Sequence, residues 1–185
     1  MDRALVVRAQ TGDHDAFTSL AAASLGHLNS VARLILRDPQ DAGDAVQDAL
    51  VEAWRSIRSL RDPDRFSAWL HRLLVRSCYD RARRERRNQI TEIRIASGLE
   101  QTTPDRQRSL AIRDQLERGL RRLPIEQRAA LVLTYYLDLP LAESATALGI
   151  PIGTLKSRLH RSIDALRAIV DADDRESASG KESLA

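Results

Sequence analysis

The sequence LPLAESATALGIPIGTLKSRLHRSIDALRAIV, residues 139–170, decides the fold of the C-terminal part of this chain. Apolar residues recur at helical spacing up to Gly149, which adopts positive φ easily, and Pro151 precedes a second helical stretch. One face of that stretch is apolar, and the opposite face with its flanks carries polar and cationic side chains: Thr154, Lys156, Ser157, Arg158, His160 and Arg161. This pattern predicts a helix-turn-helix that enters the major groove of DNA, although a solvated corner between two ordinary helices has a similar pattern.

The charged residues are unevenly distributed along the chain. Its 185 residues carry a formal net charge of +3, which favours a polyanionic partner only weakly. Residues 1–53 contain eight acidic and four basic side chains, whereas residues 54–94 contain five acidic and twelve basic ones. We therefore expect any polyanion to bind at the second of these segments.

The composition also excludes several classes of protein. The single cysteine, Cys78, rules out an internal disulfide and fits a reducing cytosol. No signal peptide or long apolar run occurs, so we expect a cytoplasmic protein without membrane insertion. The four histidines show no metal-ligand spacing, and no nucleophile–base pair or phosphate-binding glycine loop is evident. We therefore expect no metal, no cofactor and no enzymatic activity.

The clearest helix of the N-terminal half begins after Asp38. Asp38 is a favourable N-cap, Pro39 suits the first helical position, and apolar residues then keep a helical period from Ala42 to Leu60. The other face carries a group that we call the acidic strip: Asp41, Asp44, Gln47, Asp48 and Glu52. Most proteins leave such a strip in water, but it also suits docking of a basic partner.

An arginine cluster lies in the next predicted helix. Phe66 and Trp69 begin the apolar stripe of this helix, which ends in a dense group of cations: Arg81, Arg83, Arg84, Arg86 and Arg87. Cations beside aromatic rings near a loop favour unpaired, unstacked bases. The alternatives are a solvated helix end for the arginines and core packing for Phe66 and Trp69.

The helical period fades after residue 90 and returns near residue 107. We therefore predict an all-α protein with two small helical domains, 1–90 and 107–170, joined by a flexible linker over 91–106. A polar, charged tail over 171–185 is expected to be disordered. Within the first domain, Gly26 marks an expected break between two helices.

Two parts of the chain resemble the extracytoplasmic-function (ECF) sigma factors of bacterial RNA polymerase, which belong to the sigma-70 family. DAGDAVQDALVEAW at 41–54, RFSAWLHRLL at 65–74 and DRARRERR at 80–87 resemble region 2 of that family. LRRLPIEQRAALVLTYYLDLPLAESATALGIPIGTLKSRLHR at 120–161 resembles region 4. Both occur in the family's order and at its usual separation. The resemblance implies a factor that directs core polymerase to specific promoters and initiates transcription, typically in a stress response.

The resemblance also implies a role for each charged surface. In the family, region 2 binds the β′ clamp helices of the polymerase, which places Asp41, Asp44, Gln47 and Asp48 at that contact. The next loop and helix capture the −10 element as a separated strand, which assigns this work to Arg58, Arg61, Arg65, Phe66, Trp69, Arg72, Arg76, Arg83, Arg84 and Arg87. Arg76 stands where the family often has asparagine, so the −10 base preference does not carry over.

Region 4 of the family contacts the β flap of the polymerase and reads the −35 element as a duplex. In this chain the reading would fall to the six polar and cationic residues of the helix-turn-helix named above. Promoter DNA, core polymerase and an anti-sigma factor are therefore the expected partners. Two other functions remain consistent with the residues alone. A stand-alone helix-turn-helix regulator would bind duplex DNA without polymerase, and a helical adaptor of the anti-sigma type would use its arginines only for solubility.

Overall fold

The fold is described from a computed structural model, which covers residues 2–36, 38–91 and 118–182. Every regular element in these ranges is a helix, which confirms the predicted all-α class. None of these helices is both long enough and apolar enough to span a lipid bilayer. The predicted linker falls almost wholly on residues 92–117, outside the described ranges.

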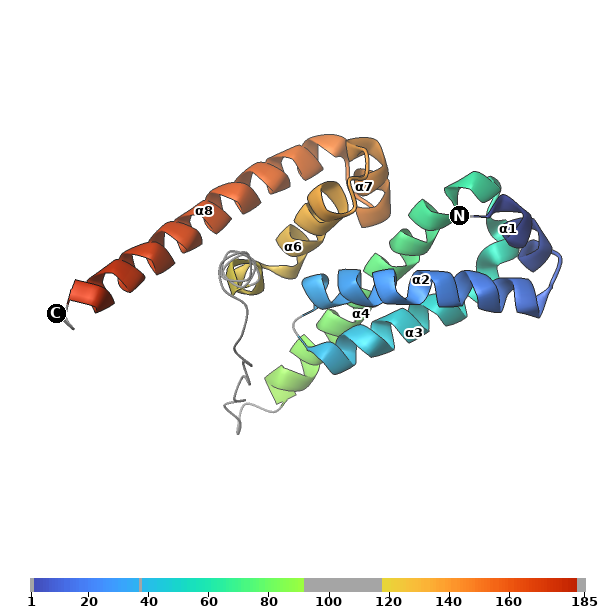
Figure 1. Cartoon of the computed structure of the whole chain (residues 1–185), viewed down its shortest axis with the longest axis horizontal. Coiled ribbons are helices and arrows are strands. Elements are labelled where there is room, and N and C mark those ends of the chain that lie inside the picture. The colour runs from blue at the N-terminus through green and yellow to red at the C-terminus, as the bar shows by residue number, and fades with distance from the viewer. Residues whose placement is uncertain (1, 37, 92–117, 183–185) are drawn as a thin grey trace.

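The first domain contains four long or medium helices. These are α1 (Arg3–Gln10), α2 (His14–Ile35), α3 (Pro39–Ser56) and α4 (Phe66–Thr91), and two 3₁₀ turns, η1 (Ile57–Ser59) and η2 (Pro63–Arg65), join α3 to α4. Helices α2 and α3 run side by side, and α4 packs along α3 (Figure 1). Small buried residues of α3, including Ala42, Ala45 and Ala49, allow this close approach.

Local capping signals explain where these helices begin. The Asp38 carboxylate accepts hydrogen bonds from the backbone N–H groups of Gln40 (2.7 Å) and Asp41 (2.9 Å), and Pro39 occupies the first turn, as predicted. Asp13 caps α2 in the same way through Ala16. The break predicted at Gly26 is wrong, because α2 continues through this residue to Ile35. Leu28, Val31 and Ile35 extend the buried stripe, and their burial outweighs the low helix propensity of one glycine.

The second domain contains the helix-turn-helix. Helix α6 (Ile125–Leu131) continues into a π-helical turn, η3 (Val132–Tyr136), followed by α7 (Leu141–Leu148) and α8 (Ile152–Glu182). Gly149 ends α7 in the left-handed conformation, with φ of 64°, as its position in the sequence predicts. Leu155 and Leu159 of α8 are buried against the domain core. The predicted helix-turn-helix is thus confirmed as α7, its turn and α8.

Helix α8 is longer than the sequence predicts. It continues to Glu182, although the chain was expected to be disordered from residue 171 onwards. The added segment mixes good helix formers, such as alanine, glutamate and arginine, with aspartate, serine and glycine, so its composition alone does not explain the extension. Figure 1 shows α8 extending from α7 away from α1.

The two domains contact each other in this structure. Helix α7 packs against α4, and α2 packs against α6 and η3. The ring of His27 on α2 stacks on Tyr136 of η3, with centroids 6.2 Å apart and planes 14° from parallel. This contact surface lies next to both predicted DNA-binding helices, α4 and α8.

Candidate functional site

The acidic strip occupies one face of α3. Its inner neighbours Ala42, Ala45 and Ala49 are fully buried, which turns the strip outward. Gln47, Asp48 and Glu52 are exposed, and Asp41 and Asp44 are half-buried. The structure therefore brings together the four residues predicted for polymerase binding, Asp41, Asp44, Gln47 and Asp48, on one helix face.

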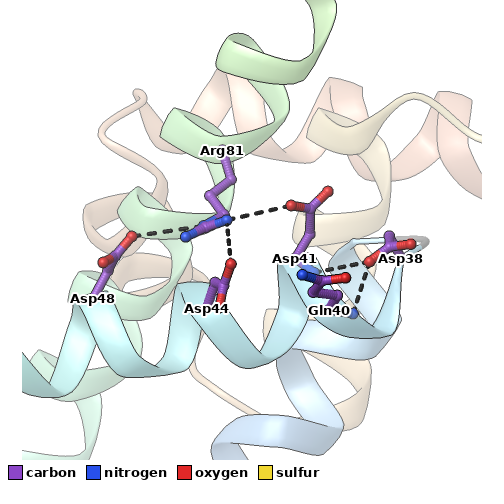
Figure 2. Close-up of polar contacts among 6 residues, drawn as sticks. All are labelled: Asp38, Gln40, Asp41, Asp44, Asp48 and Arg81. Atoms are coloured by element: carbon purple, nitrogen blue, oxygen red, sulfur yellow. Dashed lines mark hydrogen bonds and ion pairs between the residues drawn. The ribbon is translucent and has the colours of Figure 1, made fainter.

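Arg81 of α4 reaches over this strip (Figure 2). Its guanidinium Nη1 lies 2.7 Å from Asp44 Oδ2 and 3.4 Å from Asp41 Oδ1, and its Nε lies 3.6 Å from Asp48 Oδ2. Sequence reasoning placed Arg81 in the arginine cluster and missed this role. Its spacing was the available signal, because Arg81 follows the buried Leu74 and Cys78 by seven and three residues and so shares their face of α4.

The arginines predicted for −10 DNA lie on other faces. Arg72, Arg76 and Arg83 follow one another at four and seven residues, so they form one exposed stripe along α4. Arg84 is exposed beside this stripe. The connection between α3 and α4 presents three further exposed arginines, Arg58, Arg61 and Arg65. The side chain of Arg87 lies outside the described part of the chain.

Phe66 and Trp69 do not join this surface. They are only 2% and 8% exposed, and their rings pack together in the core with centroids 5.9 Å apart. Their predicted contact with −10 bases therefore needs correction, because rings buried in this way have no free face for stacking. Core packing, the alternative considered for both residues, is what the structure shows.

The predicted −35 residues begin α8. Thr154, Lys156, Ser157, His160 and Arg161 are exposed. Local contacts order this surface: Arg161 Nε donates to the Ser157 carbonyl at 3.2 Å, the Ser157 hydroxyl donates to the Thr154 carbonyl at 3.0 Å, and the His160 ring lies 3.4 Å from Asp164. All five side chains lie near the start of the helix, which is the end that a recognition helix points at base edges.

Arg158 is the exception among the six. It is half-buried, and its guanidinium lies close to the hydroxyl of Tyr79 on α4 of the first domain, without forming a hydrogen bond of standard geometry. Burial raises the pKa of Tyr79 to about 12, an effect that the positive charge of Arg158 partly offsets. The packing of the two domains thus directs Arg158 towards protein, which no local sequence signal indicated.

A buried histidine was also missed. His71 of α4 is 8% exposed, and its Nδ1 has no hydrogen-bond partner among the described residues. Burial lowers its pKa to about 4, and the neighbouring His27 ring, 5.4 Å away, adds to the shift. The spacing of His71 from Leu74, Val75 and Cys78 places it on the apolar face, which was the signal for burial.

An apolar groove of about 450 Å³ lies between α2 and α3, beside the acidic strip. Leu25, Val51 and Trp54 line it, and all three are partly exposed. Gln47 belongs both to this groove and to the strip. The surface presented by α3 therefore combines negative charge with accessible apolar area, a combination common in protein-docking surfaces.

Comparison with known proteins matches both domains. The family model "Sigma-70 region 2" matches residues 20–88, and "Sigma-70, region 4" matches residues 113–166. The ECF RNA polymerase sigma factor SigM of Mycobacterium tuberculosis is 35% identical over 161 residues, which cover 87% of this chain and 80% of SigM. SigW of Bacillus subtilis, another ECF sigma factor, is 28% identical over 174 residues, covering 88% of this chain and 92% of SigW.

Two solved structures are also similar. The sigma factor RpoE of Bartonella quintana, in complex with the anti-sigma factor NepR, has a TM-score of 0.71 at 26% identity, covering 85% of this chain and 98% of RpoE. CnrH in complex with the cytosolic domain of CnrY has a TM-score of 0.64 at 29% identity, covering 93% of this chain and 98% of CnrH.

Proposed function

This chain belongs to the sigma-70 family of RNA polymerase sigma factors, in its ECF group, and we propose from that premise how its surfaces divide the work of promoter recognition. One observation carries the function: regions 2 and 4 occur together, in order, in a single chain. Core polymerase and promoter DNA are accordingly its partners. A stand-alone regulator or an adaptor would have no use for region 2, so neither alternative is favoured.

The acidic strip is the proposed docking surface for core polymerase. Asp44, Gln47 and Asp48 face outward on a helix held rigidly by buried alanines, so the carboxylates keep their spacing when a partner approaches. Complementary charge steers association and sets the orientation of the partner. The adjoining apolar groove provides apolar surface that is buried on binding. A basic helix with apolar side chains on one edge fits this combination.

The arginine stripe of α4 and the connection before it are proposed to hold the −10 element. Opening the duplex costs a few kcal/mol for each unstacked base, and cationic side chains along a groove recover part of this cost without ATP. Arg72, Arg76 and Arg83 provide such a line of charge. With Phe66 and Trp69 in the core, the base-stacking partner must come from another group.

The start of α8 is proposed to enter the major groove at the −35 element. Lys156 and Arg161 suit phosphates or guanine edges, and Thr154, Ser157 and His160 suit further polar contacts with bases. Arg158 joins this set only when it leaves Tyr79.

Regulation and location follow from the same assignment. The similar structure of RpoE contains the anti-sigma factor NepR, which supports an anti-sigma factor as the regulator of this chain. We place the protein in the cytoplasm, where polymerase acts, and assign it no enzymatic activity of its own. Catalysis of RNA synthesis belongs to the polymerase that it directs.

Run-off transcription with purified core polymerase on genomic fragments tests the function. We expect discrete transcripts only when this chain is added, and the absence of specific initiation would refute the assignment. The double substitution Asp44→Asn with Asp48→Asn should weaken core binding on the order of tenfold or more, because it removes two exposed charges from the docking face. Asp15→Asn is the matched control, since it removes an exposed carboxylate from α2 of the same domain.

A further inference from the structure

We propose that Arg81 competes with the polymerase for the acidic strip. The guanidinium of Arg81 pairs with the carboxylates of the strip, and the polymerase must displace it in order to bind them. Arg81 thereby sets the affinity and salt dependence of docking. The inference rests on the proposed function of the acidic strip. It adds a residue from α4, a helix otherwise assigned to DNA, to the control of the polymerase contact.

The geometry makes Arg81 a shared partner. A single guanidinium serves Asp41, Asp44 and Asp48, which span two turns of α3 (Figure 2). The side chain of Arg81 is 23% exposed, whereas those of Asp44 and Asp48 are 41% and 50% exposed. The cation therefore sits on the inner side of the strip, and the carboxylates of Asp44 and Asp48 stay accessible to a second cation.

The contacts differ in strength. Asp44 lies at 2.7 Å from Arg81 Nη1, the shortest of the three ion pairs, and Asp41 accepts a hydrogen bond from the same nitrogen at 3.4 Å, but Asp48 lies at 3.6 Å from Nε, which is too long for a hydrogen bond. The Nε group has no hydrogen-bond partner among the described residues. Asp48 is thus the most exposed and the most loosely held of the three, and it is the carboxylate that a basic partner takes first.

Arg81 is not needed to hold α3 against α4. Ala42, Ala45 and Ala49 of α3 and Leu74 and Cys78 of α4 are fully buried, and this apolar contact dominates the packing of the two helices. Partly exposed ion pairs contribute little to folding stability. The main effect of Arg81 is therefore electrostatic: it reduces the charge of the three carboxylates from −3 to −2 where the basic partner binds.

The test is an equilibrium titration of the labelled full-length chain with core polymerase at several salt concentrations. Arg81→Gln should tighten binding roughly threefold to tenfold at low salt, because the partner then meets one more uncompensated negative charge. The gain should shrink as salt increases and screens the charge. Arg81→Lys, which keeps the charge, should remain close to wild type. Arg33→Gln removes an exposed arginine from α2 of the same domain and should leave affinity unchanged.

A thermal melt accompanies each variant. If Arg81→Gln lowers the melting temperature, Arg81→Met is used in the titration in its place. The long apolar side chain of methionine keeps the packing of the arginine stem. Unchanged or weaker core binding by stably folded Arg81→Gln or Arg81→Met overturns the proposal. The Asp44→Asn and Asp48→Asn double variant distinguishes failure of the docking site from failure of the Arg81 proposal. If the double variant weakens binding while Arg81→Gln and Arg81→Met do not tighten it, the docking site is supported and the role of Arg81 is refuted. If the double variant has no effect on binding, both the docking site and the role of Arg81 are refuted.

Discussion

The fold strongly disfavours the charged form of His71. Its pKa lies near 4 in the folded chain, mainly because burial penalises the imidazolium and secondarily because of His27, compared with an ordinary value of 6.5. Between these two pH values His71 is therefore protonated in the unfolded chain and neutral in the folded chain. This contribution to stability is fully present above pH 6.5 and is lost as pH falls towards 4.

The first prediction follows from this difference. The free energy of unfolding should fall by about 3 kcal/mol between pH 6.5 and 4 on account of His71, and His71→Leu should remove that part of the slope. Urea denaturation followed by tryptophan fluorescence reports on the correct domain, because both Trp54 and Trp69 lie in the first one. Identical pH slopes for wild type and His71→Leu would contradict the prediction.

Individual residues also show what sequence can and cannot predict. Asp38, Pro39 and Gly149 act within one turn of their own position, and the structure confirms the roles that their neighbours in the sequence predict. Arg81 lies forty residues from Asp41, so no local pattern could specify that pair. Distant packing likewise decided that Phe66 and Trp69 lie in the core.

At the scale of elements, the two glycines of interest have opposite roles. Gly26 lies within α2, is exposed, and a Cβ added there would meet nothing within 4 Å. Gly149 has φ of +64°, where an L side chain is strained even though space is available. The first glycine thus costs stability through backbone entropy, whereas the second is required by the turn between α7 and α8.

The second prediction contrasts these positions. Gly26→Ala should stabilise the first domain by about 0.5–1 kcal/mol, and Gly149→Ala should destabilise the second by about 1 kcal/mol or more. Urea denaturation followed by tryptophan fluorescence measures the first change, and far-UV circular dichroism measures the second. A loss of stability in Gly26→Ala would mean that α2 needs flexibility at the position where the sequence suggested a break.

At the scale of the whole molecule, the relative position of the domains matters most for DNA binding. Helix α7 packs on α4, and Arg158 of the −35 surface lies beside Tyr79 of the first domain. Neither contact was predictable, because residues that join the domains are separated by a long stretch of chain and carry no shared motif. The all-α class and the helix-turn-helix were predictable, because they depend on periodicity and caps.

The last prediction concerns this domain contact. Arg158 can join the proposed −35 surface only by leaving Tyr79, so interactions that hold the domains together should oppose its use by the free chain. The stacked pair His27 and Tyr136 is one such interaction, and neither residue belongs to a proposed DNA surface. Aromatic pairs are worth roughly 0.5–1.5 kcal/mol, so His27→Ala combined with Tyr136→Ala should tighten binding of a −35 duplex about twofold to tenfold.

Fluorescence anisotropy without core polymerase measures this change, using a duplex that carries a −35 element mapped from the run-off transcripts. Tyr135→Ala is the matched control, because it removes an exposed tyrosine from the same π-helical turn. A double variant that binds the duplex no better than wild type would show that the domain contact does not limit access to DNA. Tighter binding would instead mean that the contact between the domains restricts access of the free chain to DNA.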